Sequence, residues 1–227
     1  MPTVLITGAN RGIGLEFARR YAADGWRVHA ACRDPAGAQD LKKIKGDTAV
    51  HRLDVTEARE VAALAKALEG EPIDLLINNA GIYGARGDGP GHMDYPAWEE
   101  TLRVNTLAPL RVSEALLPNV AASDKKLIVA ITSRMASIEL NVEGGSYAYR
   151  SSKAALNAAM RSLAADVRAK GVAVAVFSPG WVKTDMGGRG APVGVTDSVA
   201  GMRAVIARLT LADSGRFFNF EGKQIPW

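Results

Sequence analysis

Short apolar runs alternate along the chain with longer segments in which apolar residues recur at the spacing of a helix. Runs such as VLIT and DLLIN are apolar almost throughout, which is typical of strands buried on both faces. The apolar runs predict strands at residues 3–7, 27–32, 48–53, 73–77, 126–132, 172–178 and 216–218. Helical spacing predicts helices at residues 12–23, 57–68, 98–122, 148–170 and 196–209. This alternation predicts an α/β protein with a parallel sheet and helices on both faces.

The pattern contains no linker, internal repeat or low-complexity tract, so residues 1–227 are predicted to form a single domain. Glycine-rich stretches at residues 84–91 and 187–194 predict mobile loops. In an open parallel sheet, ligands bind beyond the carboxyl ends of the strands, where the strand order reverses. Each motif described below falls at such a strand end.

Composition narrows the class of protein. The chain has 227 residues, 48% of them hydrophobic, which suits one domain with a substantial core. Its net charge of +4 includes no run of five like charges, which argues against nucleic-acid binding. No apolar run reaches the roughly 18 residues of a membrane span, and the N-terminus has a strand pattern rather than that of a signal peptide. The single cysteine, Cys32, suits a buried strand in a reducing compartment. We therefore expect a cytoplasmic location, and we assign no metal ligands.

Residues 7–14 read TGANRGIG and lie between the first predicted strand and the first predicted helix. Gly8 and Gly12 permit a tight turn and let the backbone approach a pyrophosphate, and Gly14 permits close packing of helix on strand. The helix N-terminus offers free N–H groups and a partial positive charge to that anion. An ordinary glycine turn is the alternative, but the placement favours a dinucleotide site. The predicted site also takes in Asn10, Arg11 and Ile13.

The end of the second strand bears on which dinucleotide binds. NAD sites usually carry an acidic residue there, which accepts from the ribose 2′-hydroxyl. Here the strand ends in Arg33, which together with Arg11 suits a clamp on a 2′-phosphate. Asp34 follows, and its carboxylate would repel that phosphate if it turned inward. The alternative is that both arginines are ordinary solvated surface residues. The sequence favours NADP(H) over NAD(H).

The ends of the third and fourth predicted strands contain further candidate cofactor-binding residues. Asp54 is placed to accept from the adenine amino group, with the Val55 backbone beside it, or alternatively to cap the following helix. The fourth strand ends in NNAG, with Asn79, Ala80 and Gly81. Small residues there let a cofactor lie against the backbone, and the asparagines can brace neighbouring strand ends.

Tyr149 and Lys153 are four residues apart in a predicted helix and therefore share a face. A lysine ammonium and a positive nicotinamide ring both favour the phenolate, so they would lower the pKa of Tyr149 from about 10. Ser133, at the end of the fifth strand, is placed to donate to the same carbonyl oxygen as the tyrosine. Asn105 is a poor helix former within a predicted helix, and it suggests a local break that holds a water. Each assignment has an ordinary alternative. Tyr149 and Lys153 would form a surface helix pair, Ser133 would cap a loop, and Asn105 would simply be tolerated in the helix.

Together, TGANRGIG, NNAG, Asn105, Ser133 and YRSSK at residues 149–153 resemble the short-chain dehydrogenases/reductases along the whole chain. The resemblance implies a Rossmann-type, doubly wound sheet of seven strands in the order 3-2-1-4-5-6-7. It implies a tetrad of Asn105, Ser133, Tyr149 and Lys153, in which Lys153 also binds the nicotinamide ribose and Asn105 holds a water of a proton relay. The family's Pro-Gly element falls at Pro179 and Gly180, with Val182 at the carboxamide and Thr184 near the nicotinamide and pyrophosphate.

Finer features, including CRDP, SRMASI and the ending GRFFNFEGKQIPW, resemble the C-factor/sniffer-type members, which are close to carbonyl reductases. Tyr147 is a rival to Tyr149, but position 151 is Ser151 rather than lysine, so we assign Tyr147 to the pocket wall or to packing. The resemblance implies hydride transfer between NADPH and a carbonyl. Relatives of the C-factor type are also associated with developmental signalling, so a cofactor-binding signalling protein is the alternative.

The substrate is a small carbonyl or alcohol, and the sequence defines it only weakly. Five residues near strand ends are candidates for an apolar pocket or for ordinary packing: Tyr83, Met135, Tyr147, Trp181 and Met186. The short glycine-rich loop at residues 187–195 predicts a small lid, which favours aldehydes, ketones or quinones. The helices at 98–122 and 148–170 resemble those that build the family's dimers and tetramers, although the subgroup includes monomers.

Overall fold

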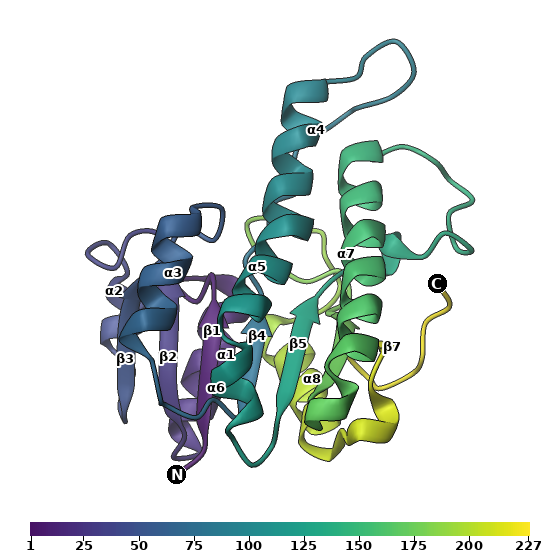
Figure 1. Ribbon diagram of the computed structural model, residues 1–227. Helices are drawn as coiled ribbons and strands as arrows, with labels where there is room; N and C mark the ends of the chain where they lie inside the picture. The colour runs from purple at the N-terminus through teal and green to yellow at the C-terminus, as the bar shows by residue number, and fades with distance from the viewer.

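The computed structural model describes residues 1–227 and contains one sheet of seven parallel strands in the order β3-β2-β1-β4-β5-β6-β7 (Figure 1). The strands are β1 (Thr3–Thr7), β2 (Arg27–Cys32), β3 (Thr48–Arg52), β4 (Leu75–Asn78), β5 (Leu127–Ile131), β6 (Ala173–Ser178) and β7 (Arg216–Asn219). Strands β1 and β2 pair from their first residues, Thr3 with Arg27, whereas β6 pairs with β7 from Ala175, its third residue. The predicted Rossmann-type, doubly wound sheet and its strand order are confirmed.

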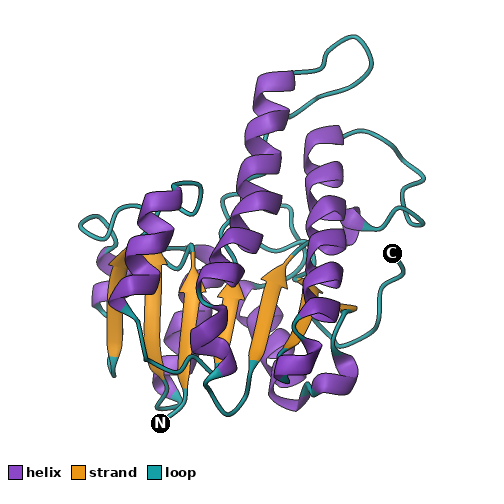
Figure 2. Ribbon diagram, viewed as in Figure 1, coloured by secondary structure: helices purple, strands orange, loops and turns teal.

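Helices cover both faces of this sheet (Figure 2). They are α1 (Gly12–Ala23), α2 (Gln39–Lys42), α3 (Ala58–Ala67), α4 (Tyr95–Leu102), α5 (Ala108–Ala115), α6 (Leu117–Ala121), α7 (Tyr147–Asp166) and α8 (Val195–Arg208). Helices α1 and α8 lie on one face, and α3, α5 and α7 lie on the other (Figure 1). Helix α2 has only four residues, and the sequence pattern did not predict it.

Two hydrophobic cores fill the layers, because successive side chains of a strand point to opposite faces. Val4 and Ile6 of β1 pack in the core that contains Phe17 of α1. Leu5, between them, packs in the core that contains Leu156 of α7. The sheet is thus buried on both faces, as its continuous apolar strands predicted. No helix of the chain is both long and apolar enough to cross a membrane.

The single helix predicted at residues 98–122 was wrong, because this stretch is interrupted twice. A π-helical turn at Arg103–Leu107 separates α4 from α5, and a break at Leu116 separates α5 from α6. Pro118 lies in the first turn of α6, where its missing N–H breaks no helical hydrogen bond, and this residue explains the second break. The first break surrounds Asn105, where the sequence predicted a local irregularity, and π turns often occur at functional sites.

Candidate active site

The motif residues gather at the carboxyl end of the sheet, beside the junction of β1 and β4 where the strand order reverses (Figure 1). The glycine-rich turn follows β1, and Asn79 to Gly81 follow β4. Ser133 lies just beyond β5, and the Pro-Gly element follows β6. Tyr149 lies in the first turn of α7, which begins at the same end of the molecule (Figure 1).

The glycine-rich turn needs its glycines for two separate reasons. Gly8 and Gly12 have φ values of +64° and +53°, in the left-handed region that favours glycine. Gly14 has ordinary backbone angles, but a Cβ there would lie 2.3 Å from the Gly8 carbonyl oxygen. Helix α1 then begins at Arg11 without any side-chain cap and without an acidic residue in its first turn. Its first N–H groups therefore remain free for an anion, which fits a pyrophosphate.

Asn79 joins the ends of β4 and β1, as the sequence predicted. Its Nδ2 donates to the carbonyls of Thr7 and Gly8 at 2.9 and 3.1 Å. The Thr7 hydroxyl in turn accepts from the backbone N–H groups of Asn79 and Ala80. Ala80 itself lies against Gly8, where a Cβ on the glycine would come within 2.9 Å of the Ala80 Cα. These contacts fix the backbone surface, after β1 and β4, against which a dinucleotide would lie.

The two arginines of the expected 2′-phosphate clamp lie in different environments. Arg33 is exposed at the end of β2 and has no ion-pair partner, so it is available to an anion. Arg11 instead pairs with Asp185, at 2.5 Å, across the mouth of the site. The structure therefore does not show the joint clamp of Arg11 and Arg33. Asp34 does not turn inward, because its Oδ1 accepts from the Gly37 N–H at 3.1 Å.

Asp54 does not cap α3, so that alternative was wrong. The N-cap of α3 is Glu57, which makes no side-chain cap. Asp54 instead accepts from the N–H and the hydroxyl of Thr56, at 3.0 and 2.7 Å. Burial raises the pKa of the Asp54 carboxyl, but these hydrogen bonds and the nearby charge of Arg33 outweigh it, so the pKa lies below its usual range. Asp54 is therefore an ionised acceptor beside Arg33 and Val55 at the end of β3.

The π turn exposes none of the Asn105 side chain, which is fully buried. Its Oδ1 accepts from the Ile82 N–H at 2.9 Å, and its Nδ2 donates to the Ile82 carbonyl at 2.8 Å and the Ser152 hydroxyl at 3.0 Å. The amide thus ties the segment after β4 to α7. Because the side chain is fully paired, the water predicted at Asn105 stays a prediction.

Lys153 is buried beneath the same site, with only 5% of its surface exposed. Its Nζ donates to the Ile131 carbonyl at 2.9 Å and lies 6.0 Å from the centre of the Tyr149 ring. No acidic side chain lies within ion-pair distance of it, and burial lowers its pKa from 10.5 to about 8. A Cβ added to Gly81 would come within 3.3 Å of this nitrogen, so glycine at this position leaves room beside the amine.

Tyr149 is also buried, with its ring stacked on Tyr83 at a centroid distance of 4.6 Å. Burial raises the pKa of Tyr149 to about 12, although a hydrogen bond with Ser133 lowers it in part. The expected lowering by Lys153 is therefore wrong for the chain on its own, because desolvation outweighs the other effects. At neutral pH the phenol keeps its proton and is a potential donor. Ser133 lies beside it and also accepts from the Met135 N–H at 3.1 Å.

The Pro-Gly element reaches back to the glycine-rich turn. Gly180 has a φ of +84°, and a Cβ on Gly12 would come within 3.4 Å of the Thr184 methyl. Val182 is buried and pairs with Val193 in an isolated bridge. Thr184 accepts from the Gly187 N–H at 3.1 Å, which closes a tight loop over the site. This loop and the turn after β1 therefore bound the same space.

The predicted pocket residues do not share one environment. Tyr83 contacts Tyr149, whereas Tyr147 packs against Trp98, which supports its assignment to packing. Trp181 is 59% exposed and donates to the Gly187 carbonyl. The sequence reading missed Asp88, which lies in a predicted glycine-rich loop yet is buried, and no local pattern singles it out.

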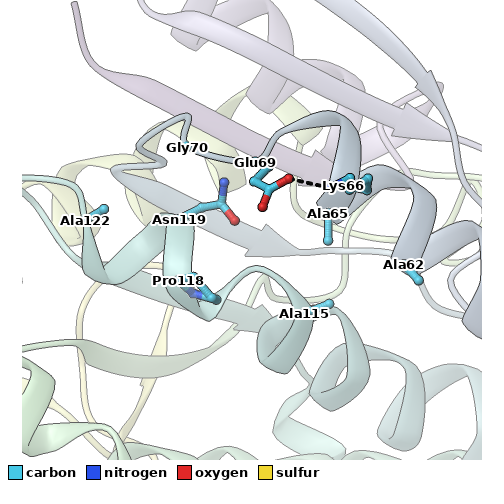
Figure 3. A pocket seen from close by; sticks show the side chains of 9 residues that line it. All are labelled: Ala62, Ala65, Lys66, Glu69, Gly70, Ala115, Pro118, Asn119 and Ala122. Carbon is cyan, nitrogen blue, oxygen red and sulfur yellow. Dashed lines mark hydrogen bonds and ion pairs between the residues drawn. The ribbon is translucent and has the colours of Figure 1, made fainter.

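A cavity of about 530 Å³ lies elsewhere, between α3 and α6 near the start of β4 (Figure 3). Small apolar side chains such as Ala65 and Pro118 line it, and the Lys66–Glu69 ion pair lies at its edge. It includes none of the motif residues. We therefore place the candidate active site at the carboxyl end of the sheet and not in this cavity.

Comparison with known proteins defines the class. The model of the short chain dehydrogenase family matches residues 2–191, and the chain belongs to this family of oxidoreductases. Within the family it is of the C-factor/sniffer-like kind. The chain is 46% identical to the C-signal protein of Myxococcus xanthus over 159 residues, which cover 69% of this chain and 93% of that protein.

Two solved structures extend the similarity to the whole chain. An NADPH-bound carbonyl reductase from chicken fatty liver has a TM-score of 0.91 and 38% identity, covering 100% of this chain and 99% of its own. The carbonyl reductase Sniffer of D. melanogaster has a TM-score of 0.93 and 31% identity, covering both chains fully.

Proposed function

We propose that this oxidoreductase transfers hydride between NADPH and the carbonyl group of an aldehyde, ketone or quinone. The observation that carries the proposal is the buried Tyr149 beside Ser133, at the same end of the sheet as the uncapped, glycine-rich N-terminus of α1. The NADPH bound to the carbonyl reductase from chicken fatty liver supports the choice of cofactor. When bound, NADPH supplies the hydride, and the protein orients the reactants and moves the proton.

The residues around the sheet's carboxyl end fit a dinucleotide along its whole length. The pyrophosphate would bind at the free N–H groups of α1, from Gly12 to Gly14. Arg33 would bind the 2′-phosphate, and Asp54 would accept from the adenine amino group. The nicotinamide half would lie between Ala80 and Gly81 after β4 and Val182 and Thr184 after β6.

Proton transfer would use three side chains of the tetrad. The Tyr149 phenol, protonated at neutral pH, would donate to the carbonyl oxygen as hydride reaches the carbon. The Ser133 hydroxyl would donate to the same oxygen and stabilise its developing charge. Lys153, whose amine lies beside Gly81, would bind the nicotinamide ribose, and Asn105 holds α7 in place through Ser152.

Turnover with a panel of aldehydes, ketones and quinones tests this function directly. We expect NADPH to be consumed with at least one carbonyl class, and with a higher kcat/KM than NADH gives. Absorbance of the reduced cofactor measures both rates in the same assay. Tight binding of NADPH without turnover on any carbonyl would contradict the proposal.

Arg33→Ala tests the preference for NADP(H). Because a guanidinium–phosphate contact is a charge-assisted hydrogen bond, we expect the Kd for NADPH to rise about tenfold to a hundredfold. The Kd for NADH, which lacks the phosphate, should change less than about twofold on the same reasoning. Arg19→Ala, an exposed arginine on α1 away from its first turn, is the matched control. Equal effects of Arg33→Ala on the two cofactors would remove the basis for NADP(H) preference.

The similarity to C-signal supports a second candidate, a cofactor-binding signalling or regulatory protein with little turnover. The same assays separate the two functions, because a protein of this kind would bind NADPH tightly and reduce nothing. The buried Tyr149–Ser133 pair favours the enzyme, since a binding protein has no need to protect a proton donor from solvent.

A further inference from the structure

Residues 82–88 follow the NNAG motif at the end of β4 and contact both the fully buried Asn105 and the first turn of α7. Asn105 holds Ile82 by both its N–H and its carbonyl. The next residue, Tyr83, lays its ring on Tyr149 with an interplanar angle of 17°. The Tyr83 hydroxyl then meets the Ser146 hydroxyl at 2.8 Å, so Tyr83 contacts α7 at two points.

Helix α7 begins without a cap of its own. Its N-cap residue, Ser146, has a φ of +49° and makes no side-chain cap, because its hydroxyl is paired with Tyr83. Tyr149 lies in the first turn, where backbone N–H groups have no partner four residues earlier in the helix. Arg150 is the first residue whose N–H donates back, to the Ser146 carbonyl at 2.8 Å. The proton donor therefore lies in the turn of α7 that is most prone to fray.

Asp88 supplies the missing cap from far along the chain. Its Oδ2 accepts from the Ala148 N–H at 2.8 Å, across 60 residues of sequence. Asp88 is only 8% exposed, and its other oxygen, Oδ1, is buried without a partner. A carboxylate is favourable at a helix N-terminus, where the backbone carries a partial positive charge. Burying a half-satisfied carboxylate is otherwise costly, which indicates that holding this turn outweighs that cost.

The same segment also contacts the loop that follows β6. The Arg86 guanidinium lies 4.7 Å from the centre of the Tyr83 ring and donates to the Met186 carbonyl at 3.0 Å. Tyr83 is therefore supported by Arg86 as well as by Tyr149 and Ser146. Two of these contacts come from α7 and its N-cap and the third from the segment of Tyr83 itself, and together they restrict the position of the Tyr83 ring.

We propose that Tyr83 and Asp88 are positioning residues, which hold the first turn of α7 so that the Tyr149 hydroxyl stays aimed at the substrate carbonyl. This inference rests on the proposed role of Tyr149 as proton donor. Neither residue transfers the proton: Asp88 acts through the backbone of Ala148, and Tyr83 acts through its ring.

Activity measurements with Asp88→Ala and Tyr83→Leu test the proposal. We expect each to lower kcat about tenfold, because small misplacements of a catalytic group are costly, with the Kd for NADPH unchanged. Asp88→Asn keeps an acceptor oxygen and should restore most of the activity that Asp88→Ala loses. Asp94→Ala is the control, since the exposed Asp94 is the N-cap of α4 itself and accepts from the Ala97 N–H at 2.9 Å. Wild-type kcat in Asp88→Ala and Tyr83→Leu, beside an inactive Tyr149→Phe, would overturn the inference and leave the proposed function standing.

A pH profile tests whether Tyr83 acts on the Tyr149 hydroxyl. Burial is the main cause that raises the pKa of Tyr149, and the neighbouring Tyr83 phenol raises it further. In alcohol oxidation Tyr149 must accept a proton, so the rate should rise with pH through this pKa. Tyr83→Leu should move that midpoint to lower pH, whereas Tyr95→Leu, at an exposed tyrosine, should not. An unmoved midpoint in Tyr83→Leu would count against the role of Tyr83.

Amide hydrogen exchange tests the helix turn without relying on turnover. Asp88→Ala should speed exchange of the Ala148 and Arg150 amides about tenfold relative to the wild-type chain, and Asp94→Ala should leave both amides unchanged. Unchanged exchange in Asp88→Ala would overturn the inference even if the enzyme were active. If the wild-type protein reduced no carbonyl, the proposed function would fail, and exchange would still decide whether Asp88 holds this turn.

Discussion

Tyr149→Phe should lower kcat for carbonyl reduction by about 10²- to 10⁴-fold, the usual contribution of a positioned general acid. The substitution removes only the hydroxyl, and the ring keeps its place against Tyr83. Because the phenol hydroxyl is next to Ser133 and not at the uncapped start of α1, the Kd for NADPH should change less than about twofold. Steady-state rates and quenching of protein fluorescence by NADPH measure the two quantities separately.

Tyr147→Phe is the matched control, because Tyr147 lies two residues earlier in the same helix. It is 37% exposed, packs against Trp98 and has no lysine four residues later. We expect it to keep wild-type kcat. Retained turnover in Tyr149→Phe would contradict the assignment of Tyr149 as the proton donor. Loss of turnover in Tyr147→Phe alone would assign that role to Tyr147.

Local sequence pattern predicted the sheet well, because its strands are apolar runs that both cores bury. The bounds of β1, α1 and β2 match the prediction residue for residue. The long helix at 98–122 failed because its first break depends on a tertiary contact. Asn105 pairs with the backbone of Ile82, 23 residues earlier, and the helical pattern carries no sign of that pairing.

The candidate site, like the fold, could be predicted from the sequence only in part. The roles of the glycines and of the strand-end residues could be predicted, because the steric demand at Gly8 and the bracing by Asn79 follow from residue type and position in the sequence. Long-range polar contacts were not predictable: Arg11 pairs with Asp185 across 174 residues, and Asp88 accepts from the Ala148 N–H across 60. For the chain on its own, the pKa of Tyr149 is raised rather than lowered, because spacing identifies the lysine but says nothing of how deeply the phenol is buried. The lowering by a bound nicotinamide ring stays a prediction.

Lys153→Met should make the fold more stable while lowering kcat by about 100-fold or more, the usual range when one electrostatic group is removed from a site. The buried Lys153 amine has one hydrogen bond, to the Ile131 carbonyl, and no acidic partner. Its pKa falls from 10.5 to about 8, a difference that corresponds to about 3 kcal/mol of destabilisation in the charged form. Loss of the hydrogen bond offsets about 1 kcal/mol, so we expect a net gain of about 2 kcal/mol at pH 7.

Because burial lowers the pKa of Lys153, the effect of Lys153→Met on stability depends on pH. The pKa of Lys153 is lower in the folded chain than in the unfolded one, so at pH 7 both states are charged and the folded state bears the full cost of burial. Between pH 8 and 10.5 the folded chain has released the proton while the unfolded chain retains it, so the cost fades as pH rises. The stability advantage of Lys153→Met should therefore be largest at pH 7 and nearly absent at pH 10.5.

Urea unfolding of the wild-type and variant chains at pH 7, 8.5 and about 10 measures this difference directly. Lys170→Met, at an exposed lysine, should show no such pH-dependent difference. A variant that is less stable than wild type at pH 7, or whose advantage is the same at each pH, would show that burial of the charge is not what limits stability here. The expected result would mean that the protein retains a destabilising buried amine because the chemistry at Tyr149 requires it.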